Sequence, residues 1–300
     1  MFYLLSLSDY KRQQTNYLKM VNFGNIPESF SDRIDSEVVI IPVPYDGTST
    51  WIKGADQGPD ALLRASCNLE LYDLETGTEV YRKGIFTDKP VLENHSPEQM
   101  IKHVFDRSMY WINKGKFIIT LGGEHTVCLG TVKAFAEKFK DLSVIQIDAH
   151  ADLRNSFNGL VYNHACVMAR IREYCPIIQV GIRSMDIEER AMIEKERVFW
   201  AHEIRKGDKW MERVIGLLTD SVYITIDLDG LDPSIMPSTG TPEPGGMLWY
   251  QLLKLLKKVI SVKSLVGFDI VELCPNESNK APDFLAAKLL YKILSYKYQS

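Results

Sequence analysis

The chain has 300 residues, of which 45% are hydrophobic and 25% are charged, and its formal net charge is −4. A chain of this size and composition can bury a large core. The slight acidic excess argues against a nucleic-acid-binding protein, and no run of about 18 apolar residues predicts a membrane span. Because no linker or repeat divides the chain, we expect one domain over residues 1–300. Residues 1–36 have a less regular pattern and are a candidate N-terminal arm over a neighbouring subunit.

The cysteine content bears on the cellular location. The five cysteines form no CxxC pair, and an odd number leaves one unpaired in any disulfide scheme, which suits a reducing compartment. The first residues show neither a basic leader nor the long apolar core of a signal peptide. We therefore expect a cytoplasmic protein.

Apolar runs typical of strands alternate with amphipathic segments along the chain. Because parallel strands need helical connections, this alternation predicts a three-layer α/β/α fold with a mostly parallel central sheet. Ligand sites in such sheets lie beyond the carboxyl ends of the strands. The predicted strands cover residues 38–45, 117–123, 143–148, 177–183, 197–201, 222–229 and 265–273, and the clearest helical segments cover residues 58–72 and 126–140.

Three of these apolar runs end in potential metal ligands. If strand geometry continues past residue 148, the alternate side chains of Asp148, His150 and Asp152 point to the same face. The same spacing relates two more carboxylates, and a sixth ligand follows a Gly-Gly pair that permits a tight turn. The six candidate ligands are His125, Asp148, His150, Asp152, Asp227 and Asp229.

Four converging carboxylates repel one another unless cations neutralise them, so the pattern predicts two divalent metal ions. Oxygen-rich ligation with only two histidines favours Mn²⁺ over zinc. Cys128 is expected to be structural, because a thiolate does not suit such a site. Taken singly, each motif also fits an Asp that caps a helix or a turn.

The chain resembles the ureohydrolases, the family of arginases and agmatinases, from about Ile40 to the C-terminus. The motifs that carry the resemblance are GGEHTV (122–127), DAHADLR (148–154), ITIDLDGLDP (224–233) and DIVELCP (269–275). The resemblance implies an arginase-like fold and a trimer or hexamer. It also implies that Asp148 and Asp227 bridge two Mn²⁺ ions. One ion would be completed by His125 and Asp152, and the other by His150 and Asp229.

The resemblance also implies a reaction on a small cationic guanidino substrate. Metal ions lower the pKa of bound water, so a hydroxide between them would attack the guanidinium carbon. Asp152 would hold this hydroxide, Glu272 would pair with the guanidinium nitrogens, and His164 would bind near the substrate and deliver a proton to the leaving amine. Glu272 also fits a solvated strand end, and His164 fits a helix cap.

The substrate is less well defined. Arg154, Leu160 and Ser184 stand where arginases hold the carboxylate and amine of arginine, so the resemblance favours the agmatinase branch and hydrolysis of agmatine to putrescine and urea. Arg154 either turns aside into an ion pair or binds a carboxylate, as guanidinobutyrate would require. Aminopropylagmatine, arginine and a catalytically silent metal-binding oligomer remain alternatives. The Pro- and Gly-rich residues 234–247 are expected to shape the entrance.

Overall fold

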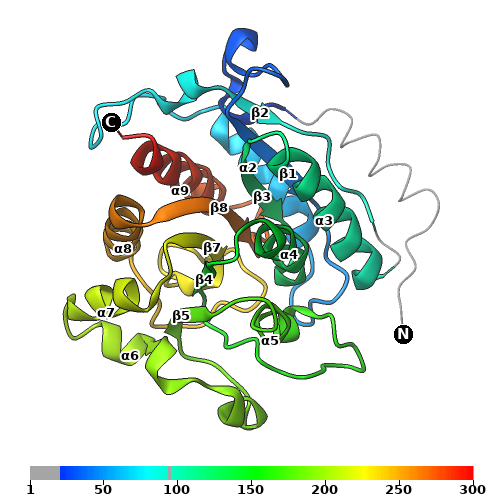
Figure 1. Ribbon diagram of the computed structural model, residues 1–300, viewed down its shortest axis with the longest axis vertical. Coiled ribbons are helices and arrows are strands. Elements are labelled where there is room, and N and C mark those ends of the chain that lie inside the picture. Colours follow the sequence, from blue (N-terminus) through cyan, green and yellow to red (C-terminus); the bar gives the residue numbers. More distant parts are fainter. Residues whose placement is uncertain (1–20, 94–95, 300) are drawn as a thin grey trace.

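The computed structural model describes residues 21–93 and 96–299, and its centre is a parallel β-sheet (Figure 1). In this part of the chain the sheet has eight strands, in the order β2-β1-β3-β8-β7-β4-β5-β6. All neighbouring strands run parallel. The strands are β1 (Val38–Val43), β2 (Ile85–Thr87), β3 (Phe117–Gly122), β4 (Leu142–Ile147), β5 (Ile177–Ile182), β6 (Val198–Trp200), β7 (Ser221–Asp227) and β8 (Ser264–Val271).

Helices cover both faces of the sheet. Helices α2, α6, α7, α8 and α9 lie on one side of the sheet, and α3, α4 and α5 lie on the other (Figure 1). Buried side chains of the first set belong to one hydrophobic cluster, and those of the second set belong to another. No helix in the described ranges is both long and apolar enough to cross a bilayer. The helices are α2 (Gly58–Ser66), α3 (Pro97–Ile112), α4 (Cys128–Lys138), α5 (Val167–Ile171), α6 (Ala201–Ile204), α7 (Lys209–Leu217), α8 (Trp249–Val262) and α9 (Ala281–Lys297).

The predicted fold class is confirmed, because strands buried on both faces require continuous apolar runs, and the chain supplies them. Every residue of β4 is buried, and so is every residue of β1, β3, β5 and β7. The helix predictions were too long. The helix expected over residues 58–72 ends at Ser66, and the one expected over residues 126–140 begins as α4 at Cys128, after a short 3-10 turn, η5 (His125–Val127).

One structural expectation was wrong. Strand geometry does not continue through the ligand motifs, because β4 ends at Ile147 and a 3-10 turn, η9 (Leu228–Gly230), follows β7 directly. Asp152 has a φ of 54°, which strand alternation does not produce. The loops after the strands, rather than alternation along them, therefore orient these ligands.

The four central strands carry the predicted site residues. β3, β8, β7 and β4 are consecutive neighbours in the sheet. Asp148 follows β4 directly, Asp227 is the last residue of β7, and Glu272 follows β8 directly, while His125 comes three residues after β3. Parallel strands bring their carboxyl ends to one edge, so these residues meet there although up to 147 positions separate them in sequence.

The N-terminal residues that the structure describes pack against their own chain. The Phe23 side chain is fully buried and stacks on Tyr291 of α9, with ring centroids 6.3 Å apart. Its amide nitrogen donates to Thr87 Oγ1 of β2 at 3.0 Å. Residues 1–20 of the predicted arm lie outside the described residues, and the single domain over residues 1–300 stays a prediction.

A buried lysine ties α9 to the loop that follows α2. Lys292 is 6% exposed, and its Nζ lies 3.0 Å from Asp73 and 2.7 Å from Glu75. Glu75 also accepts a hydrogen bond from the Tyr296 hydroxyl and pairs with the exposed Lys257 at 2.8 Å. Because Lys292 and Asp73 are both buried, each compensates the desolvation of the other.

We expect Lys292→Met to lower the free energy of unfolding at pH 7 by about 3 kcal/mol, because it leaves the buried Asp73 carboxylate without its cation. Lys257→Met removes only an exposed partner of Glu75 and is expected to cost less than about 1 kcal/mol. Urea unfolding of both variants measures the difference. Equal costs would contradict the structural role of Lys292.

The loss of stability in Lys292→Met should depend on pH. Hydrogen bonds from Lys257 and Lys292 lower the pKa of Glu75 from 4.5 to about 2. The folded state thus has the lower pKa, so its stabilisation is complete above about pH 4.5 and is lost as the pH falls toward 2. The stability gap between the wild type and Lys292→Met should therefore narrow over this range. A gap that stays constant on acidification would contradict the assignment.

Candidate functional site

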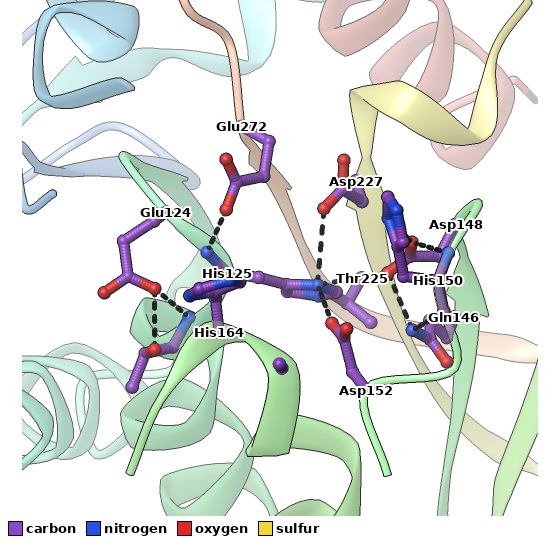
Figure 2. Close-up of polar contacts among 12 residues, drawn as sticks. Glu124, His125, Gln146, Asp148, His150, Asp152, His164, Thr225, Asp227 and Glu272 are labelled. Atoms are coloured by element: carbon purple, nitrogen blue, oxygen red, sulfur yellow. Dashed lines mark hydrogen bonds and ion pairs between the residues drawn. The ribbon is translucent and has the colours of Figure 1, made fainter. Parts of the chain in front are cut away.

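The first group of ligands surrounds His125, which η5 holds just beyond β3. Its Nδ1 atom lies 3.0 Å from Asp152 Oδ2, 3.1 Å from Asp148 Oδ2 and 3.5 Å from Asp227 Oδ2 (Figure 2). Gly123 allows this approach, since a Cβ atom there would lie 2.0 Å from the Tyr45 carbonyl oxygen. The close packing, rather than an unusual φ, explains the Gly-Gly pair.

The second group shares a ligand with the first. His150 Nδ1 lies 2.9 Å from Asp229 Oδ2 and 3.7 Å from Asp148 Oδ1. The possible ligand atoms of Asp148, His150 and Asp229 all lie within 4.8 Å of one another, as do those of His125, Asp148 and Asp152. Asp148 thus belongs to both groups, one oxygen toward each histidine, which is the arrangement expected of a carboxylate between two cations.

The carboxylates are buried and held by fixed donors. Asp148 is inaccessible to solvent, and it accepts hydrogen bonds from Gln146 Nε2 at 2.7 Å and from the His150 amide at 2.6 Å. The Ala149 amide donates to Asp229, and the Asp229 amide donates to Asp227. These donors fix the oxygens without neutralising their charges.

The electrostatics of the cluster call for a cation. Burial raises the pKa of Asp148 to about 7, and the Asp152 and Asp229 carboxylates add to this shift. Burial also raises the pKa of Asp227 well above its usual value, with Asp229 and Asp148 contributing. In contrast, the pKa of Asp229 is lowered to about 2; burial opposes this change, but the neighbouring His150 outweighs it. Divalent cations would remove the repulsion that burial intensifies.

The protonation of His125 also fits a metal ligand. Its Nε2 atom lies 2.9 Å from Thr225 Oγ1, and the Thr225 hydroxyl donates to Asp269 Oδ1 at 2.7 Å. Thr225 can therefore only accept from His125, which places the ring proton on Nε2. The buried Nδ1 atom makes no hydrogen bond of acceptable geometry. Nδ1 is then the ring nitrogen that faces three carboxylates, which is the position of a ligand if a metal ion displaces any proton there, so the residues present fit such an ion.

Glu272 lies beside the ligands, at the end of β8. Its Oε1 atom accepts a hydrogen bond from the His125 amide at 2.8 Å (Figure 2), and its φ is 65°. Burial raises the pKa of Glu272 well above its usual value, and Glu124 contributes. A bound cation would favour the ionised carboxylate. The Glu272 carboxylate is thus suited to pair with a bound cation, which would compensate its burial.

His164 lies on another element, at the start of the 3-10 turn η6 (His164–Cys166). Asn163, not His164, caps this turn, because the Asn163 side chain accepts from the Ala165 amide. His164 is half-buried, and its Nδ1 atom lies 3.1 Å from Thr48 Oγ1. Its ring meets Phe157 edge-on, with centroids 6.0 Å apart. The structure thus removes the cap as an explanation for this histidine.

Arg154 turns toward acidic neighbours at the rim. Its NH2 atom lies 3.3 Å from Asp186 Oδ2, its Nε atom lies 4.0 Å from Glu189 Oε2, and its guanidinium stacks over Phe157 at 4.6 Å. Asp186 and Glu189 form the capping box of the 3-10 turn η7 (Ile187–Met192). Of the two orientations expected from the sequence, the structure shows the ion pair.

The predicted residues line a common cavity of about 270 Å³. This cavity is smaller than a typical drug-sized site of roughly 300–1,000 Å³ and suits a slender ligand. Residues 234–247 contribute Gly240 and Thr241, as expected of an entrance loop. The predicted site residues that line it are His125, His150, Asp152, Arg154, His164, Asp227, Asp229 and Glu272.

Some residues of the site were missed from the sequence. His164 is contacted by Thr48, and His125 is contacted by Thr225, which in turn donates to Asp269. The sequence alone did not reveal them, because Thr, and Asp within strands, are common in any α/β sheet. Glu124 is part of the GGEHTV motif, yet the motif does not show which residue it holds. Cys128 is fully buried and belongs to neither group of possible ligands in the described residues.

Comparisons with known proteins agree with this geometry. The sequence pattern described as "Arginase family" matches residues 36–295. The chain is 38% identical over 280 residues to a protein named N(1)-aminopropylagmatine ureohydrolase from Synechocystis sp., covering 90% of this chain and 92% of the relative. It is 32% identical over 263 residues to a protein named agmatinase from Pyrococcus horikoshii, covering 87% of this chain and 92% of the relative.

A solved structure extends the likeness to the fold. The agmatine ureohydrolase of Thermoplasma volcanium matches with a TM-score of 0.85 and 31% sequence identity, covering 96% of this chain and 98% of that chain. The resemblance inferred from the motifs is therefore confirmed over nearly the whole length. The chain belongs to the arginase family of metal-dependent ureohydrolases.

Proposed function

We propose that the protein hydrolyses the guanidinium group of a small cationic substrate at a binuclear Mn²⁺ site, releasing urea and an amine. The observation that carries the proposal is Asp148, a fully buried carboxylate shared by two groups of possible metal ligands. His125 and Asp152 serve one ion, and His150 and Asp229 serve the other. Asp227 would be the second carboxylate to hold the ions, and its Oδ2 atom lies 3.5 Å from His125 Nδ1.

The oxygen-rich ligand set supports Mn²⁺ over zinc. When bound, the two ions supply a nucleophile near neutral pH by lowering the pKa of water. Asp152 orients this water through a hydrogen bond. Its backbone, at a φ of 54°, turns the carboxylate back toward His125. The protein thus provides the geometry in which the attacking oxygen is held.

Glu272 is the proposed anchor for the guanidinium. Its Oε1 atom already accepts from the His125 amide, and the carboxylate lines the cavity. Pairing a carboxylate with the planar guanidinium nitrogens orients the carbon toward the ligands. Burial disfavours the charged form of Glu272. A cationic substrate would compensate this charge and a neutral one would not, so the cationic substrate is bound better here.

His164 is the proposed proton donor to the leaving amine. It lines the same cavity as Glu272 but belongs to neither group of possible ligands. An imidazole can hold and release a proton, so it can carry one to the nitrogen that departs. The reaction then ends with urea and a protonated amine.

The rim supports a substrate with a distal cation. Arg154 is paired with Asp186 and approached by Glu189, so two carboxylates face one guanidinium. This arrangement argues against Arg154 as a carboxylate ligand for guanidinobutyrate or arginine. Agmatine, the expectation from the sequence, and N1-aminopropylagmatine both carry the required distal cations. The higher identity to the relative that bears the second name favours the longer compound.

We further propose the remaining expectations for this enzyme: a cytoplasmic location and a homo-oligomer, trimeric or hexameric. The amine product would belong to polyamine biosynthesis, since putrescine or its aminopropyl derivative is released. Size-exclusion chromatography with light scattering tests the oligomer directly. A monomer would contradict this part of the proposal.

The function is tested by incubating Mn²⁺-loaded protein with N1-aminopropylagmatine, agmatine, guanidinobutyrate and arginine, and by measuring urea. We expect the highest kcat/KM for N1-aminopropylagmatine, followed by agmatine. In Asp148→Asn turnover should fall to background, because the shared ligand of both ions is lost. Full activity of this variant would contradict the two-metal site. Metal binding without urea from any substrate would support the silent oligomer instead.

His164→Asn is expected to lower kcat by about 100-fold or more, the usual contribution of a general acid. Metal content, measured by atomic emission after dialysis, should equal that of the wild type, because His164 is no ligand. Loss of metal in this variant would make His164 structural. Asn keeps a polar side chain that can hydrogen-bond but cannot carry a proton, so the proposed proton transfer is removed.

Asp186→Asn tests the rim. Asn keeps the cap of η7 but leaves Arg154 with only the more distant Glu189 carboxylate as its counter-charge near the entrance. We expect KM for agmatine to rise about fivefold, the factor that about 1 kcal/mol between partly exposed charges represents, with kcat retained. Glu188→Gln removes a charge from the same turn without contacting Arg154 and is the matched control. An equal rise in KM in both variants would mean that only the net charge matters, and it would contradict a specific role of the Arg154–Asp186 pair.

A further inference from the structure

We propose that Thr48 and Glu124 are positioning residues for His164. Glu124 binds the single hydroxyl proton of Thr48, so Thr48 can only accept a hydrogen bond from Nδ1 of His164. The ring proton is thereby fixed on Nδ1, and Nε2 is the nitrogen that exchanges protons in the cavity. This inference rests on the proposed role of His164 as proton donor.

The first step of the argument is the position of Thr48. It lies in the loop after β1, 116 residues from His164 in sequence, and is 7% exposed. Its Oγ1 atom lies 3.1 Å from Nδ1 of His164 and accepts from the His164 amide at the same distance of 3.1 Å. One hydroxyl thus contacts both the backbone and the ring of this histidine.

The second step is the direction of the Thr48 hydrogen bond. Glu124 is fully buried, and its Oε1 atom lies 2.9 Å from Thr48 Oγ1. Its Oε2 atom accepts from the Thr126 amide at 3.0 Å and from the Thr126 hydroxyl at 2.6 Å. A carboxylate with these donors only accepts, so the Thr48 proton points to Glu124.

The third step is the tautomer. Because the Thr48 proton is committed, only lone pairs face His164, and Nδ1 must carry a proton to make the contact at 3.1 Å. The edge-on contact with Phe157 limits rotation of the ring from another side. In the view of Figure 2, Glu124 and His164 lie on the side of His125 away from His150. The two residues therefore act apart from the shared carboxylate.

The consequence concerns turnover rather than substrate binding. A neutral ring with its proton on Nε2 would present a lone pair to the lone pairs of Thr48, which is repulsive, and could not take up a further proton at Nε2. Thr48 and Glu124 exclude this form. Loss of the Thr48 hydroxyl would leave the ring free to rotate and to mix tautomers, so kcat would fall while KM changed little.

The direct test is nitrogen NMR of protein labelled with ¹⁵N-histidine and loaded with a diamagnetic divalent ion such as Zn²⁺ or Mg²⁺, because paramagnetic Mn²⁺ would broaden the resonances of a histidine in the same cavity. The sequence has six histidines, and His164→Asn identifies the resonance of interest. We expect the neutral His164 ring to show a protonated Nδ1 in the wild type and a mixture of tautomers in Thr48→Val. Thr48→Ser, which keeps the hydroxyl, should keep the wild-type pattern. A ring protonated on Nε2 in the wild type would overturn the proposal.

Kinetics provide the second test. Thr48→Val should lower kcat about 10- to 100-fold, a part of the usual contribution of a general acid, with KM within about threefold of the wild type and unchanged metal content. Thr48→Ser keeps the hydroxyl and should restore most of the loss. In the His164→Asn background, Thr48→Val should cause no further loss. A full additional loss in the double variant would overturn the proposal.

The outcomes separate this inference from the function on which it rests. If His164→Asn retains full turnover, the proposed proton donor is wrong, whatever Thr48 does. If His164→Asn is impaired but Thr48→Val behaves as the wild type, only the positioning role fails. The tautomer measurement needs no substrate, so it tests the hydrogen-bond direction even if urea release is not observed.

Discussion

The structure depends on one electrostatic constraint, the gathering of several carboxylates in a buried place. Asp148, Asp227 and Asp229 are each at most 4% exposed, and burial alone penalises every one of these charges. The sheet sustains this arrangement because adjacent parallel strands end at the same edge, and backbone amides in the following turns hold the oxygens. Cation binding relieves the repulsion only in the folded chain, which couples metal affinity to folding.

The same device holds both functional histidines but sets opposite tautomers. His125 donates from Nε2 to Thr225, and Asp269 accepts the threonine proton, so Nδ1 is left for the carboxylate cluster. In the proposed network, His164 donates from Nδ1 to Thr48, and Glu124 accepts from the Thr48 hydroxyl. In each case a buried carboxylate fixes a hydroxyl, and the hydroxyl fixes a ring. The candidate metal ligand His125 thus contacts its threonine through Nε2, whereas the proposed proton donor His164 contacts its threonine through Nδ1.

The sequence was sufficient for the candidate ligands and for seven of the eight described strands, because continuous β-branched runs and Asp or His at their ends are local signals. It missed the edge strand β2, whose three residues are too few to form such a run. It was insufficient for the way these residues converge. Asp152 and Glu272 have positive φ values, which for residues other than glycine only the surrounding packing can impose. The contact of Thr48 with His164 spans 116 residues and leaves no periodic trace. Tertiary packing, not local pattern, supplies this information.

The residues proposed for the reaction and those proposed for substrate choice lie in different parts of this fold. The candidate metal ligands and the proposed guanidinium anchor follow the ends of β3, β4, β7 and β8, where hydrogen bonding along whole strands limits movement. The Arg154 ion pair and residues 234–247 belong to loops, which tolerate substitution more readily. In the proposed function, the balance of charge around Arg154, rather than the metal site, sets the preference for a distal cation.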